Sequence, residues 1–136
     1  MKFICLVYNE EQKLDALSED ELGALVGECG GWVRALEKNG HHITSMGLQS
    51  VRTATTVRRR NGKPTVTDGP FAETKEQLGG FSLIDARDLN EALRIAAELP
   101  AARLGSVEVR PVLEPGAELT TALDRKVAAA MRRKER

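Results

Sequence analysis

The first apolar segment of the chain carries large side chains on both faces of a predicted strand. Successive side chains of a strand point to opposite faces. Residues 2–8 therefore divide into two apolar rows, which are Phe3, Cys5 and Val7 on one face and Ile4, Leu6 and Tyr8 on the other. A strand that is apolar on both faces belongs in the middle of a sheet. We therefore expect a sheet that needs cover on each side.

Composition excludes several classes of protein. The 136 residues fit one domain with a substantial core. The 20 basic and 20 acidic side chains give no net charge, which argues against a nucleic-acid-binding protein. No apolar run approaches the ~18–20 residues that span a bilayer, and the N-terminal apolar stretch is too short for a signal peptide. We therefore expect a cytoplasmic protein that does not bind membranes or nucleic acid.

The two cysteines do not have the spacing of a metal site. Cys5 and Cys29 lie within apolar patterns, without a second cysteine or a histidine at ligand distance along the chain. We interpret them as reduced core residues and predict no metal site and no cofactor.

A helical pattern follows the first strand. Ser18 and Glu21 form a capping box, and the helix is expected to run to about Asn39. Its apolar residues recur at helical spacing and are Leu22, Leu25, Val26, Cys29, Trp32, Val33 and Leu36. Glycine costs roughly 1 kcal/mol relative to alanine inside a helix, so the pair Gly30-Gly31 predicts close packing or a kink.

The next elements are predicted as strands. Residues 41–49 form the second strand, and residues 53–59 and 63–67 form a hairpin that turns at Asn61-Gly62. The basic tip of the hairpin, with Arg58, Arg59, Arg60 and Lys63, has no interleaved aromatic residues and is interpreted as a solvated extension.

Strands and a helix complete the predicted fold. A turn-rich connection over residues 68–78 leads through Gly79-Gly80 into a strand over 81–85. A second helix begins at Asp88 and ends before Pro100, burying Ala92, Leu93, Ala96 and Leu99. Residues 107–112 form the last strand of the domain.

This order of elements predicts an α+β fold. It is the ferredoxin-like βαββαβ plan with an inserted β-hairpin, over residues 1–115. Residues 116–136 are predicted to form a C-terminal amphipathic helix with a basic tail, Arg132 to Arg136. The apolar positions of this helix are Leu119, Leu123, Val127, Ala130 and Met131.

The apolar first strand also bears on assembly. Both helices of a ferredoxin-like fold lie on one face of the sheet, which leaves the second apolar face of residues 2–8 without cover. Two such faces packed together in a two-fold homodimer would bury it. In the alternative, the C-terminal helix folds back over this face within one chain.

The segment Val66 to Phe81, VTDGPFAETKEQLGGF, resembles the signature of the DGPF-domain proteins, a branch of the YCII-related superfamily. The resemblance covers roughly residues 1–115 and is supported by Thr53 to Arg58, Ala86 to Leu93 and Gly105 to Pro111. It implies a dimeric α+β barrel of ferredoxin-like protomers. Genes of such proteins often lie beside those for extracytoplasmic-function sigma factors. Some enzymes of the wider superfamily use a His-Asp pair, but the helix over 18–39 contains no histidine.

Three carboxylates lie on the connection that carries the motif. Asp68, Glu73 and Glu76 are close enough in sequence for two of them to share a proton or to hold a cation. A turn aspartate and a solvated acidic loop explain the same residues. Asp68 and Glu73 are candidate catalytic residues, and Glu76 is a candidate ligand-binding residue. The other candidate ligand-binding residues on this connection are Gly69, Pro70 and Phe71.

Two other side chains are candidates. His41 and His42 open the second strand and point to opposite faces; His41 is a candidate general base, although a packing role explains it too. Arg110 is a candidate ligand-binding residue because arginine binds carboxylates in two-point contacts. It shares a face with Glu108, and an ion pair between them, or with Arg58, is the alternative.

Two functions follow from these residues. In the first, the protein is a homodimer that binds a small polar or anionic molecule in a cleft lined by the connection Asp68 to Gly80, with chemical transformation of that molecule left open. In the second, the protein is a non-enzymatic accessory or regulatory module of a sigma-factor pathway, in which the connection builds the dimer.

Overall fold

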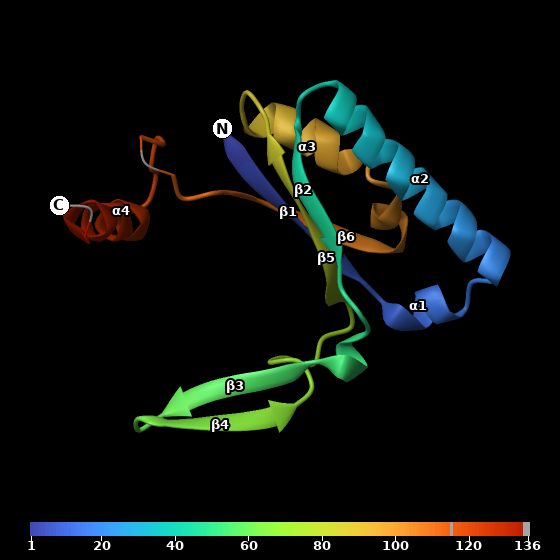
Figure 1. The fold of residues 1–136 in the computed structure, drawn as a ribbon, viewed down its shortest axis with the longest axis horizontal. Coiled ribbons are helices and arrows are strands. Elements are labelled where there is room, and N and C mark those ends of the chain that lie inside the picture. The colour runs from blue at the N-terminus through green and yellow to red at the C-terminus, as the bar shows by residue number, and fades with distance from the viewer. Residues whose placement is uncertain (115, 135–136) are drawn as a thin grey trace.

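The computed structural model describes residues 1–114 and 116–134. An antiparallel four-stranded sheet forms its centre, with the strand order β2-β5-β1-β6. The strands are β1 (Lys2–Asn9), β2 (His42–Gly47), β5 (Gln77–Asp85) and β6 (Gly105–Pro111). With two helices on one face (Figure 1) this is the ferredoxin-like α+β arrangement, so the predicted fold class is confirmed. β1 lies between two other strands, as its two apolar rows predict.

Two helices cover one face of the sheet. α2 (Glu19–Lys38) begins with the predicted capping box of Ser18 and Glu21, and α3 (Leu89–Ala97) is capped by Asp88. The indole nitrogen of Trp32 in α2 donates a hydrogen bond of 3.0 Å to the carbonyl oxygen of Ile95 in α3. The core under these helices contains Phe3, Cys5, Val7, Trp32, Leu36, Ile84, Ala92, Ile95, Ala96 and Leu99.

Some predicted core positions differ. Leu93 is exposed, because Ala92, Ile95 and Ala96 form the face of α3 that packs on the sheet and Leu93 lies outside that row. Val26 of α2 is 63% exposed. The pair Gly30-Gly31 is not closely packed, since the nearest atoms to an added Cβ belong to the side chain of Arg34.

The inserted hairpin is a separate two-stranded ribbon (Figure 1). β3 (Thr55–Arg60) and β4 (Lys63–Asp68) are joined at Asn61-Gly62, whose φ angles of 53° and 75° fit the tight turn predicted there. β5 begins at Gln77, earlier than predicted, and includes Gly79-Gly80. A Cβ at Gly80 would lie 2.9 Å from the carbonyl oxygen of Met46 in the neighbouring strand, so glycine permits this pairing.

Short helical segments occur where the sequence predicted none. α1 (Glu11–Asp15) follows β1, the 3-10 turn Val51–Thr53 follows β2, and a second 3-10 segment, Pro100–Leu104, follows α3. The first two each follow a strand of the central sheet, and the third leads from α3 into β6.

The C-terminal helix does not cover the sheet. α4 (Ala122–Lys134) lies well apart from the four-stranded sheet, on the side away from α2 and α3 (Figure 1). The single-chain alternative for covering the second apolar face is therefore wrong. Of the residues assigned to the C-terminal segment, Glu135 and Arg136 of the basic tail lie outside the described residues.

The sheet face without helices is consequently open. We call the open face the apolar side chains that lie on this side of β1, β2 and β5: Ile4, Leu6, Tyr8, Met46, Phe81 and Leu83. Ser106, Glu108 and Arg110 of β6 continue the same face. In the part of the chain that the structure describes, no helix combines the length and apolar character needed to cross a membrane.

Candidate functional site

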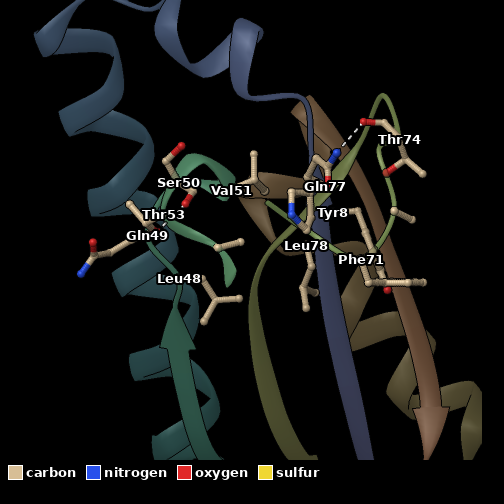
Figure 2. A pocket seen from close by; sticks show the side chains of 13 residues that line it. Tyr8, Leu48, Gln49, Ser50, Val51, Thr53, Phe71, Thr74, Gln77 and Leu78 are labelled. Atoms are coloured by element: carbon tan, nitrogen blue, oxygen red, sulfur yellow. Dashed lines mark hydrogen bonds between the residues drawn. The ribbon is translucent and has the colours of Figure 1, made fainter. Parts of the chain in front are cut away.

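A cavity of about 730 Å³ lies where the hairpin joins the sheet. Its walls come from the end of β1, from the segment after β2 and from the connection between β4 and β5. Figure 2 shows Leu48, Ser50 and Thr53 on one side, and Tyr8, Phe71 and Leu78 on the other. The full lining is Tyr8, Leu48, Gln49, Ser50, Val51, Thr53, Ala54, Pro70, Phe71, Ala72, Thr74, Gln77 and Leu78.

The Asp-Gly-Pro-Phe turn builds one wall. Gly69 has a φ of 103°, which favours glycine. Its backbone nitrogen donates to the carbonyl oxygen of Ala54 at 2.8 Å, and its carbonyl oxygen accepts a bond of 2.7 Å from the hydroxyl of Thr56. Arg58 donates to the carbonyl oxygen of Phe71 at 3.1 Å. These bonds fix the turn against the base of the hairpin, with Pro70 and Phe71 placed at the cavity.

Glu11 holds the opposite wall. Its carboxylate accepts bonds of 2.7 Å from the backbone nitrogen of Val51 and 2.8 Å from the hydroxyl of Ser50. The bond from Val51, then that from Ser50, lowers the pKa of Glu11 below its usual range. Sequence analysis missed this residue, because its partners lie about 40 positions away and only the fold brings them together.

Replacing Glu11 by glutamine should lower the free energy of unfolding near neutral pH by about 1 kcal/mol. Hydrogen bonds to a charged group often contribute more, but this carboxylate is partly exposed and water screens its charge. The folded pKa is lowered, so this contribution is present above the unfolded pKa of ~4.3 and is lost as the pH falls through the folded pKa. Urea unfolding of both proteins between about pH 7 and pH 3 should show the difference shrinking with acid. Glu10→Gln is the matched control, and a difference independent of pH would contradict the assignment.

The three carboxylates of the connection do not line the cavity. Asp68 ends β4 and is exposed, and Glu73 is exposed on the loop. Glu76 is half-buried and accepts a hydrogen bond of 2.7 Å from the hydroxyl of Ser106, which ties the loop to β6. Of the candidate residues on this connection, the cavity wall therefore includes Pro70 and Phe71, and Gly69 lies beside them outside the lining.

His41 lies at the other end of the sheet. Its Nδ1 is 2.8 Å from the carbonyl oxygen of Asp85 and 3.9 Å from the carboxylate of Glu91, near the start of α3. The structure does not bring it together with Asp68 or Glu73. His42 contacts the hydroxyl of Ser45 at 2.9 Å, and Ser45 contacts Ser82 at 2.8 Å, so this second histidine belongs to a hydrogen-bonded chain on the helix side.

Arg110 lies on the open face of β6 and not at the cavity. Its Nε is 3.9 Å from the carboxylate of Glu108, the ion pair that sequence analysis gave as the alternative. Arg58 is in the hairpin and donates to Thr67 and to Phe71, so it does not pair with Glu108 across the sheet.

The cavity's lining sets the chemistry it can support. Among the described residues, the lining consists of apolar side chains, hydroxyls of Tyr8, Ser50, Thr53 and Thr74, and amides of Gln49 and Gln77, with no charged group. Residues 1–114 and 116–134 hold no group of three or more His, Cys, Asp or Glu side chains that could bind a metal ion. The arrangement suits binding through apolar contact and a few hydrogen bonds.

Comparison with known proteins identifies the family of the domain. The sequence model of the YCII-related domain matches residues 1–115. The chain belongs to the YCII-related family. An uncharacterised protein of Rhizobium meliloti (strain 1021) is 40% identical to this YCII-related chain over 114 residues, which are 82% of this chain and 92% of the relative. α4 lies beyond the matched residues.

Proposed function

We propose that this YCII-related protein binds a small, mostly apolar molecule in the cavity beside the Asp-Gly-Pro-Phe turn. The observation that carries the proposal is the cavity itself. Its volume of about 730 Å³ falls within the ~300–1,000 Å³ typical of small-molecule sites. The motif residues Pro70 and Phe71 contribute to its wall, and Gly69 fixes their position.

The lining favours a neutral ligand over the polar or anionic one that the sequence indicated. An anion in this cavity would lose water without gaining a cationic partner among the lining side chains, and burying an unpaired charge is costly. An aromatic molecule with one or two hydrogen-bonding groups fits apolar walls that also carry hydroxyls and amides. Catalytic roles for Asp68, Glu73 and His41 stay predictions, as does the cytoplasmic location.

We also propose that the protein is a homodimer. The open face carries six apolar side chains, Met46 exposed and the other five half-buried, and none of the described helices lies over it (Figure 1). A second copy packed on this face would remove the apolar patch from water. Tyr8 belongs both to the open face and to the cavity lining, so the cavity lies next to this proposed interface.

The alternative function is a non-enzymatic accessory module of a sigma-factor pathway. One observation favours it: Phe71 is 82% exposed, and exposed aromatic side chains are frequent anchors in protein interfaces. In this case the turn would serve protein contact, and the cavity would bind no small molecule.

Thermal unfolding with added compounds separates the two functions. Indole and phenol serve as neutral aromatic probes, and benzoate serves as the anionic one. At 100 times its dissociation constant a ligand stabilises the folded state by about 2.7 kcal/mol, so we expect a rise in melting temperature with the neutral probes and a smaller one with benzoate.

Ala72→Trp, which places an indole in the cavity, should abolish this rise. Thr65→Trp, at an exposed position of β4, should leave it unchanged. Equal shifts in both variants would place binding outside the cavity, and no shift with any probe in the unsubstituted protein would favour the accessory module.

A further inference from the structure

α4 presents an apolar stripe that stays exposed among the described residues of its own chain. Leu123, Val127 and Met131 recur every four residues and are 68%, 39% and 47% exposed. The helix has 13 residues, and isolated helices of this length are marginal in water. We therefore expect α4 to be stabilised by packing its apolar stripe on a surface outside its own chain.

The charge of α4 restricts what that surface can be. Within Ala122–Lys134 the basic side chains are Arg125, Lys126, Arg132, Arg133 and Lys134, against the single acidic Asp124. A partner surface should therefore be apolar at its centre and acidic around it.

The cavity has such surroundings. Phe71 stands exposed at its wall, and an adjoining hollow that shares Val51 and Thr74 with the cavity is lined by Glu10 and Glu11 and by one basic residue, Lys75. Glu10 also pairs with Lys13 at 3.6 Å. Glu73 lies between two lining residues of the connection, and we call Glu10, Glu11 and Glu73 the acidic rim.

Symmetry can bring α4 to this rim, although one chain cannot. The segment before α4 leaves β6 at Pro111, which pairs with Phe3 at the beginning of β1, whereas the cavity lies at Tyr8 near the end of β1. α4 and the hairpin both project on the side of the open face (Figure 1). A two-fold axis perpendicular to the strands places the beginning of β1 in one copy over its end in the other.

We propose that α4 is exchanged between two copies of this chain. The stripe of α4 from one copy packs against Phe71 at the mouth of the other copy's cavity, and its basic side chains face the acidic rim. Each cavity is then closed by a segment of the second copy. The inference rests on the proposed homodimer and extends it to a helix beyond the family domain, residues 1–115.

Disulfide trapping between two differently tagged chains tests the exchange. One chain carries Phe71→Cys and the other Val127→Cys, both with Cys29→Ser; Cys5 is kept, since burial raises the pKa of its thiol to about 11 and leaves it unreactive. Mild oxidation of the mixture should give the mixed disulfide as its main cross-linked product. Val26→Cys, on the outer face of α2, replaces Val127→Cys in the control pair and should give at least tenfold less.

A second variant tests the energetic role of the stripe. Leu123→Ser, Val127→Ser and Met131→Ser together change side chains that are exposed in the protomer, so the fold should persist while the dimer dissociation constant rises at least tenfold. If the unsubstituted protein dimerises but the pair of Phe71→Cys and Val127→Cys chains cross-links no better than the control pair, or if the triple variant dimerises as tightly, the exchange is wrong and the dimer stands. If the unsubstituted protein is a monomer, the proposed dimer itself is wrong.

Discussion

Leu6→Glu is expected to convert the proposed homodimer into folded monomers. Leu6 lies in the middle of the central strand and faces the open side of the sheet, directly opposite Phe81 of β5 and Glu108 of β6. In a monomer the new carboxylate reaches water. In a face-to-face dimer it would be buried without a partner and beside Glu108, which costs several kcal/mol.

The expected weakening is large enough to measure directly. A loss of about 4 kcal/mol corresponds to roughly a thousandfold rise in the dissociation constant. Sedimentation or light scattering across micromolar concentrations measures it, and near-ultraviolet circular dichroism checks that the protomer stays folded. Val26→Glu is the matched control, since Val26 is an exposed apolar residue on the helix side. A Leu6→Glu protein that dimerises like the Val26→Glu protein would place the interface elsewhere.

Local signals in the sequence predicted the elements well. Ser18 with Glu21 and Asp88 with Glu91 mark the starts of α2 and α3, and Asn61-Gly62 marks the hairpin turn. Each signal involves residues no more than three positions apart, so the contact can be recognised from the local sequence alone. The two apolar rows of β1 likewise predicted its central place in the sheet.

The candidate site was harder to predict because it depends on contacts between distant residues. The motif predicted a ligand site at the turn, and Pro70 and Phe71 of that turn line the cavity. The opposite wall depends on Glu11 and its bonds to Ser50 and Val51. No sequence pattern within a single helix or strand predicts a hydrogen bond between residues about 40 positions apart.

Chain direction explains the separation of His41 from the motif. β2 spans six residues, and at ~3.3 Å per residue it carries the chain roughly 20 Å from His41 to the end where the hairpin and the cavity lie. The position of the carboxylates outside the cavity lining has another reason. Spacing along a connection shows that Asp68, Glu73 and Glu76 are near one another, and it does not show which way each side chain points.

Two glycine-to-alanine changes are expected to act in opposite directions, and the loss at Gly105 is the larger. Gly105 opens β6 opposite Asn9, where an added Cβ would overlap the carbonyl oxygen of Tyr8. Its backbone is extended, so the obstacle is space and not conformation. The obstructing atoms belong to the backbone, and β1 and β6 would have to separate at the end that carries Tyr8.

Gly105→Ala should therefore cost about 3 kcal/mol, the upper end for an overpacked site, and lower the melting temperature by roughly 10 °C. Gly27→Ala is the matched change inside α2, where no atom lies within 4 Å of an added Cβ, and it should stabilise the protein by about 0.5–1 kcal/mol. Urea unfolding of the three proteins gives both values. If Gly105→Ala unfolds at the same urea concentration as the unsubstituted protein, β1 and β6 do not approach each other this closely at Tyr8, and the wall of the cavity that depends on this contact would have to be redrawn.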